Sequence, residues 1–87
     1  MRVPTIHLNG TSKEALLEQV VAAQAAVCAA LHALREAWPN GRDYYPQGPG
    51  ALREAEAEMN SRCARLDSVD RELGALALAI YEGGHGR

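Results

Sequence analysis

The chain has 87 residues, enough for one small domain, and its hydrophobic fraction of 47% includes much alanine and no phenylalanine. Alanine is the best helix former and lets helices approach closely, so this composition favours packed helices over a bulky core. The formal net charge of −2 argues against a protein that binds polymeric nucleic acid non-specifically.

The N-terminus reads M-R-V-P and lacks the apolar core of a signal peptide, which predicts a protein of the cytosol. No uninterrupted apolar run approaches the roughly eighteen residues of a membrane helix, so no membrane span is expected. In the cytosol, Cys28 and Cys63 are expected to be thiols rather than a disulfide.

Residues 3–8 read V-P-T-I-H-L, and their alternating polar and apolar side chains predict a short β-strand. Pro4 restricts this strand to a sheet edge or to its first residue. A single strand cannot satisfy its own backbone, so it is expected either to pair with another copy or to lie along a helix.

Asn9 and Gly10 end this strand, and the capping-box pattern from Thr11 to Glu14 predicts a helix over residues 12–37. Pro39 ends the helix because it disfavours helical geometry at Trp38. An apolar stripe at three- and four-residue steps contains Leu16, Val20, Ala23, Val27, Ala30 and Leu34, and it is widened by Leu17, Val21, Cys28 and Leu31. A stripe this wide predicts contact with more than one neighbouring helix.

Residues 38–50 hold three of the four prolines and form the predicted loop. A second helix is predicted over 51–82, followed by a loose tail at 83–87. Its heptad row contains Leu52, Met59, Leu66, Leu73 and Ile80, and a second row contains Ala55, Val69 and Leu76, with Arg62 as the polar exception. This is the pattern of a coiled-coil seam, in which Arg62 would face the first helix near Cys28 or Leu31.

The expected fold is therefore a mainly α antiparallel two-helix hairpin with a short N-terminal strand. Such a hairpin buries little surface alone, so assembly into a dimer or higher oligomer is expected. If Trp38 lies level with Leu52, Cys28 lies nearly level with Cys63. Two buried free thiols are favoured there, and a disulfide is the alternative.

The first candidate site is the loop, where Asn40, Arg42, Asp43, Tyr44 and Tyr45 bring together an amide, a guanidinium, a carboxylate and two phenols. Tyrosine can stack on a base, arginine can bind phosphate through two hydrogen bonds, and the amide and carboxylate can read polar edges. The structural alternative is a turn with an Arg42–Asp43 pair and tyrosines that plug the end of the bundle.

The second candidate site is the start of the first helix, at Asn9, Thr11 and Ser12, where free backbone N–H groups favour anions. An ordinary helix cap is the alternative. A 26-residue helix is about 39 Å long, so the two candidate sites can share a pocket only across an antiparallel dimer.

Other chemistry is not expected. His7, His32 and His85 lack metal-ligand spacing with one another or with the cysteines, and no nucleophile–base pair or carboxylate dyad is present. The sequence thus predicts a protein that is not an enzyme and that uses no metal or cofactor. Arg62 is expected to extend to solvent or to pair with an acid of another subunit, and an anion site is its alternative role.

The motifs Leu8-Asn9-Gly10-Thr11-Ser12 and Pro39-Asn40-Gly41-Arg42-Asp43-Tyr44-Tyr45 resemble those of small phage and prophage proteins of about this length. By size, helical build and expected oligomerisation, that group is similar to phage anti-defence sponges, which sequester cyclic nucleotide or cyclic ADP-ribose signals of the Thoeris and CBASS systems between subunits. The resemblance implies a non-enzymatic sponge in the host bacterial cytosol, binding an unspecified nucleotide-derived ligand. The alternative is a helical protein-interaction module, such as a virion accessory protein or a host-enzyme inhibitor, without a small-molecule ligand.

Overall fold

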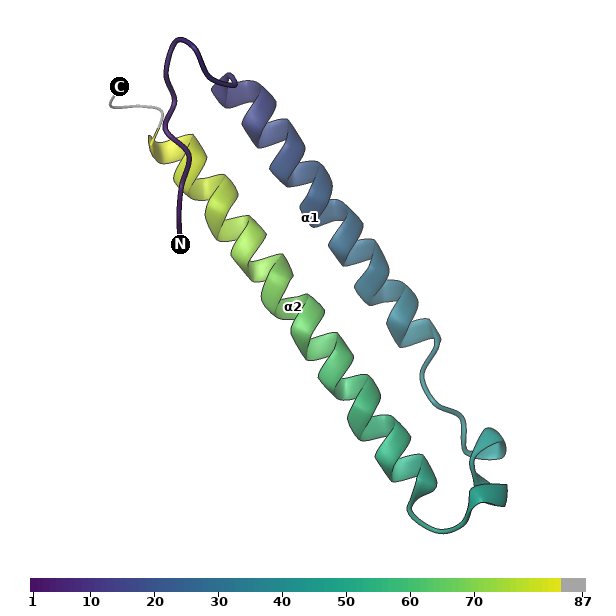
Figure 1. Cartoon of the computed structure of the whole chain (residues 1–87). Helices are drawn as coiled ribbons and strands as arrows, with labels where there is room; N and C mark the ends of the chain where they lie inside the picture. Colours follow the sequence, from purple (N-terminus) through teal and green to yellow (C-terminus); the bar gives the residue numbers. More distant parts are fainter. Residues whose placement is uncertain (84–87) are drawn as a thin grey trace.

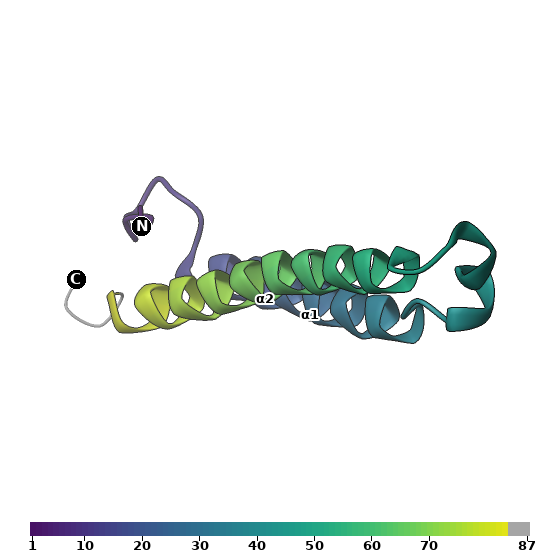
Figure 2. The same cartoon turned by 90° about the horizontal axis from the view of Figure 1, so that it is seen from below.

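The computed structural model describes residues 1–83 and is built from two long helices joined by a loop (Figure 1). Helix α1 spans Lys13–Glu36, and α2 spans Ala51–Gly83. The loop contains two short 3-10 helices, η1 at Gly41–Asp43 and η2 at Tyr45–Gln47. The helices lie antiparallel in a single layer (Figures 1 and 2), forming a rod of 62 × 19 × 17 Å. The predicted helical hairpin is confirmed.

Local capping defines the two ends of α1. The Ser12 side chain accepts a hydrogen bond from the Ala15 backbone N–H at 3.1 Å, which satisfies one of the free donors of the first turn. Because Ala15 occupies the third helical position, only half of a capping box forms. At the other end, the Ala37 N–H bonds to the carbonyls of Ala33 and Leu34 before Pro39 stops the helix.

The predicted strand over residues 3–8 is absent, since this segment has no regular secondary structure in the described chain. A strand needs another extended backbone beside it, and residues 1–83 offer only helices and turns. Instead, the segment crosses the last turns of α2 on one side of the helical layer (Figures 1 and 2). Val3 and Ile6 are half-buried there, and Ile80 of α2 is only 1% exposed. The segment therefore lies along a helix, the second of the two expected arrangements.

The helices meet along a seam whose residues alternate at three- and four-residue steps, the spacing of antiparallel helix pairs. The α1 seam residues are Leu17, Val20, Gln24, Val27, Leu31 and Leu34. The α2 seam residues are Met59, Cys63, Leu66, Asp70, Leu73, Ala77 and Ile80. All are buried or half-buried. The predicted row thus lies at the helix interface from Met59 to Ile80, whereas Leu52 lies beside Gly41 of the loop.

The second predicted row of α2 lies beside the seam rather than in it, since Ala55 is buried and Leu76 half-buried but Arg62 and Val69 are exposed. Cys63, Asp70 and Ala77 complete the seam, and Arg62 does not face α1. In each heptad, the second seam position can lie three or four residues from the first. The sequence pattern favoured the row that contains Val69 and Leu76, because it is the more apolar of the two. The observed seam also carries a hydrogen bond between the helices, in which Gln24 Nε2 donates to the Asp70 backbone carbonyl at 3.3 Å.

The expected register is also wrong. Cys28 lies beside Asp70, which is seven residues further along α2 than Cys63, the residue expected at this level. Both cysteines are free thiols, and Cys28 is exposed rather than buried as a small hydrophobe. The shift arises because the chain does not reverse tightly at the loop. The first turns of α2 extend past the end of α1 and pack against η2 instead.

Two further expectations concern the chain's ends and its hydropathy. By length and composition alone, α1 is apolar enough to cross a membrane, although Glu18, Gln19 and Gln24 interrupt its apolar runs. The expectation that the chain has no membrane span therefore remains a prediction. Within the predicted tail, Gly83 belongs to α2, and residues 84–87 lie outside the described part of the chain.

Candidate functional site

The loop is held by its own side chains and glycines. The Asn40 Oδ1 accepts a hydrogen bond from the Arg42 backbone N–H at 2.9 Å and so caps η1. Gly48 and Gly50 have φ values of 103° and 93°, a left-handed conformation that a side chain would strain. A Cβ at Gly41 would lie 3.5 Å from Leu52 Cδ2, so η1 lies close to the first turn of α2. The loop therefore forms a structured tip at one end of the rod.

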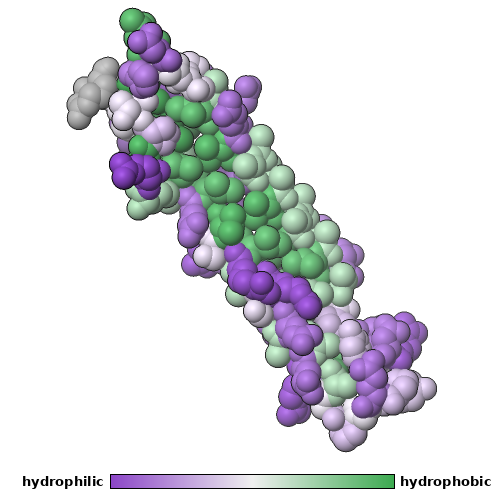
Figure 3. Space-filling model, viewed as in Figure 1, coloured by the Kyte–Doolittle hydropathy of each residue, from purple (hydrophilic) through white to green (hydrophobic). Residues whose placement is uncertain are grey.

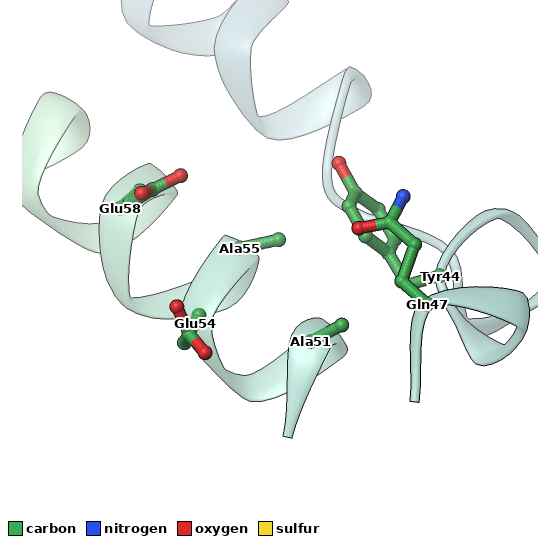
Figure 4. A pocket seen from close by; sticks show the side chains of 6 residues that line it. All are labelled: Tyr44, Gln47, Ala51, Glu54, Ala55 and Glu58. Carbon is green, nitrogen blue, oxygen red and sulfur yellow. The ribbon is translucent and has the colours of Figure 1, made fainter. Parts of the chain in front are cut away.

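An open groove of about 330 Å³ runs between this tip and α2 (Figure 4). Its loop wall is formed by Tyr44 and Gln47, and its α2 wall by Ala51, Glu54, Ala55 and Glu58. Tyr44 is half-buried and Ala55 is buried, so the tyrosine ring covers the small side chains of α2. Two carboxylates and no cation line the groove. Its field therefore favours cationic groups and disfavours phosphate.

The remaining loop candidates face solvent. Tyr45 is 78% exposed, and Trp38 is also exposed. Arg42 and Asp43 are exposed, and in the described part of the chain neither forms an ion pair. The expected Arg42–Asp43 pair is thus not formed. The expected tyrosine plug holds for Tyr44 only, which leaves Tyr45 available to a partner.

The second candidate site lies at the opposite end of α1 (Figure 1). There the Ser12 hydroxyl is occupied as the helix cap, while Asn9 and Thr11 are exposed. The Gly10 N–H bonds to the His7 carbonyl and closes a turn before the helix. The 24 residues of α1 separate this site from the tip by about 36 Å at 1.5 Å per residue. One chain does not bring the two candidate sites together.

Polar contacts across the seam were not expected from the sequence. Cys28 Sγ donates to Asp70 Oδ1 at 3.0 Å, and this hydrogen bond, with the negative charge of Asp70, raises the pKa of the Cys28 thiol. Gly74 lets Gln24 approach, because a Cβ at Gly74 would lie 3.1 Å from Gln24 Nε2. A glycine inside an otherwise regular helix was the available signal for such a close approach.

A cation–π contact joins the open end of the hairpin. Lys13 Nζ, in the first turn of α1, lies 4.7 Å from the ring centroid of Tyr81 near the end of α2. Among residues 1–83, no group of three His, Cys, Asp or Glu side chains is arranged to hold a metal ion. The hairpin is thus joined by polar contacts at its centre and at its open end.

Comparison with known proteins gives no relative, since no family model, no curated protein and no solved structure matches this chain. Any function must therefore be argued from the groove, the tip and the helical surfaces themselves.

Proposed function

We propose that this protein is a non-enzymatic interaction module that binds a partner protein through the tip of its hairpin. The observation that carries this proposal is the joint exposure of Trp38, Arg42 and Tyr45 on one structured loop. These three residue types dominate the binding energy of protein interfaces. The Asn40 cap and the two left-handed glycines hold the loop in shape, which lowers the entropy lost on binding.

The groove beside the tip supports a protein partner more than a phosphate-bearing ligand. Glu54 and Glu58 would repel phosphate groups, and the groove is open rather than enclosing. A lysine or arginine side chain of a partner would complement it, while Tyr45 and Trp38 supply apolar contact beside it. The partner surface best suited to this tip is therefore basic with an apolar centre.

The test begins with affinity capture from bacterial lysate and continues with one identified partner in purified form. The variants Tyr45→Ala and Arg42→Ala are each expected to weaken its binding at least ten-fold, about 1.4 kcal/mol. Leu8→Ala is the matched control, because Leu8 is 97% exposed at the other end of the rod. Equal affinities for all three variants, measured by titration calorimetry, would overturn the proposal.

A second candidate function is the predicted anti-defence sponge of phage or prophage origin, acting in the host cytosol on a cyclic nucleotide or cyclic ADP-ribose-type signal. It is supported by Arg42 and Tyr45, which leave a guanidinium without an ion pair and a phenol ring free on the same loop. Arg42 would hold phosphate and Tyr45 would stack on a base. Thr11 of a neighbouring subunit would complete the pocket, since the tip and the α1 start are far apart in one chain.

The sponge requires assembly of hairpins, which remains a prediction. Its test is the melting temperature of the purified protein with candidate cyclic nucleotides. A ligand at a hundred times its Kd would stabilise the fold by about 2.7 kcal/mol. A shared pocket predicts that Arg42→Ala and Thr11→Ala each abolish the same shift. No shift with any nucleotide favours the interaction module.

A further inference from the structure

The two sides of the helical layer differ in chemistry. In both helices, the residue that follows a seam residue lies on one side, as shown by Cys28 beside Asp70 and Gln24 beside Gly74. The residue that precedes a seam residue lies on the other side. This second side, here called the apolar side, carries Leu16, Ala23, Ala30, Val69 and Leu76, with Arg62 as a charged member of the same row.

The polar side is already satisfied by contacts within the chain. It holds the Cys28–Asp70 hydrogen bond and an ion pair between Arg71 Nε and Asp67 Oδ2 at 3.0 Å. Arg35 and Asn60 are exposed in the same rows. Val21 and Leu78, which follow the seam residues Val20 and Ala77, are also exposed on this side, where they lie among these polar and charged groups.

Within residues 1–83, the apolar side is covered at its two ends. The N-terminal segment crosses the last turns of α2, and Ala55 near the tip is buried beside Tyr44 and Gln47 of the loop. Between them, Ala23, Ala30 and Val69 are exposed. Figure 3 shows hydrophobic residues gathered along both helices over the half of the rod nearer the termini, with hydrophilic residues toward the loop. The uncovered middle is therefore a two-helix-wide apolar strip.

We propose that a second copy of this chain covers the apolar side with its own apolar side, giving a dimer of stacked hairpins. The exposed surface area of the chain supports a dimer. The chain exposes 6434 Å², whereas a folded monomer of 9.4 kDa exposes about 5000 Å². The excess of about 1400 Å² per chain is more than the roughly 800 Å² that a standard interface removes from each partner, so the chain exposes enough surface for a dimer interface. The radius of gyration is 19.0 Å, whereas a compact domain of this length has about 12 Å, so the single chain is extended rather than compact.

The apolar side is also complementary to a second copy of itself. The apolar rows of both helices repeat every seven residues, as the seam does, so they fit another pair of helices with the same repeat. Alanines at positions 23 and 30 let the facing helix approach closely. Because the apolar strip lies on one side of each hairpin, two copies that cover each other's strip leave none of it exposed, and the assembly closes at the dimer.

A second copy suits this strip better than a lipid surface does. Although α1 is apolar enough for a membrane, α2 supplies half of the strip and carries Arg62 in the same row as Val69 and Leu76. Arg65 and Glu72 flank that row on the outer face of α2. Charges of both signs at the edge of an apolar strip are typical of the rim of a protein interface.

Two valines on opposite sides provide a matched pair of variants. Val69 is 40% exposed on the apolar side, and Val21 is 52% exposed on the polar side. The wild type is expected to sediment with twice the mass of the 9.4 kDa chain at micromolar concentrations. Val69→Lys is expected to weaken the dimer at least ten-fold, and Val21→Lys to leave it unchanged, with equal helical circular dichroism confirming that both variants fold.

Three outcomes would overturn the dimer. The first is a monomeric wild type up to about 100 µM, where any Kd tighter than that leaves mostly dimer. In the second, Val21→Lys dissociates the dimer while Val69→Lys does not. In the third, the wild type is monomeric and sediments with vesicles of phosphatidylcholine and phosphatidylglycerol, and Val69→Lys abolishes that binding. Because the tip is not involved, a failed dimer leaves the proposed tip interaction intact, and the reverse also holds.

Discussion

Single residues explain how this small hairpin is held at points where its apolar contacts are few. Ser12 supplies the cap of α1, and Asn40 supplies the cap of η1. Asp70 receives hydrogen bonds at two different atoms, its carbonyl from Gln24 and its carboxylate from Cys28. Polar groups at these positions therefore specify the start of a helix, the shape of the tip and the level at which the two helices meet.

The Cys28 thiol is expected to react slowly for an exposed cysteine. Asp70 raises its pKa, so less thiolate is present at a given pH, and the thiolate is the reactive form. Asp70→Asn should lower the pKa and speed alkylation by iodoacetamide at pH 8, in a Cys63→Ser background where Cys28 is the sole thiol. Because folding raises this pKa, any stability it lends is present below the thiol's unfolded pKa and is lost as the pH rises through the folded value. Equal alkylation rates with and without the Asp70 carboxylate would contradict this account.

The cap at Ser12 makes a prediction that separates structure from binding. Ser12→Ala should lower the stability by about 1 kcal/mol, because the Ala15 N–H loses its partner at the start of α1. Thr11→Ala is the matched control, since Thr11 is exposed and makes no such hydrogen bond, and it should change stability by less than about 0.5 kcal/mol. Urea denaturation followed by circular dichroism measures both. A larger loss of stability for Thr11→Ala than for Ser12→Ala would show that Thr11, not Ser12, caps α1.

At the scale of elements, the fold depends on one seam, the interface between α1 and α2. Among residues 1–83, four apolar side chains are buried: Leu31, Ala55, Met59 and Ile80. The loop and the N-terminal segment cover the parts of α2 that α1 does not reach. Because α2 is nine residues longer than α1 (33 against 24), its first turns need the loop as a packing partner.

Leu31 is the seam residue whose loss should be felt most in α1. Leu31→Ala leaves a cavity opposite α2 and is expected to cost about 2–5 kcal/mol, a large share of the stability of a chain this small. Leu78→Ala is the control, because Leu78 is exposed on α2, and its effect should stay within about 0.5 kcal/mol. Chemical denaturation at one fixed protein concentration compares them. Similar losses at both positions would mean that Leu78 is buried in an assembly.

At the scale of the whole molecule, the shape itself is informative. A rod of 62 × 19 × 17 Å made of one layer of helices cannot enclose a core, since each helix has a neighbour on one flank only. The apolar side, the tip and the acidic groove are three separate surfaces on this rod. Self-association and partner binding therefore need not compete for the same residues.

Assembly through the apolar side predicts a melting temperature that depends on concentration. If unfolding and dissociation are coupled, mass action raises the midpoint as the protein is concentrated. Raising the chain concentration from about 5 to 500 µM, a factor of a hundred, adds about 2.7 kcal/mol of apparent stability per dimer when folding and dimerisation are fully coupled. Val69→Lys should flatten this dependence, whereas Val21→Lys should preserve it. A midpoint that is constant for the wild type would contradict coupled assembly.

The sequence by itself determined the elements that depend on nearby residues. The helix start at Ser12, the stop before Pro39, the loop with its glycines and the long second helix all follow from capping, proline geometry and heptad spacing. It also placed Arg42 and Tyr45 correctly on the loop between the helices.

Only the tertiary structure decided which rows of side chains on α1 and α2 face each other, and in which register the two helices pair. A seven-residue repeat offers two neighbouring rows of α2, and Asp70 rather than Val69 contacts Gln24 and Cys28, which lie more than forty positions away. The register likewise depends on the path of the loop, whose packing against α2 moves Cys28 from Cys63 to Asp70. Residues 3–8 remained irregular because strand pairing requires a second backbone, which no local pattern can supply.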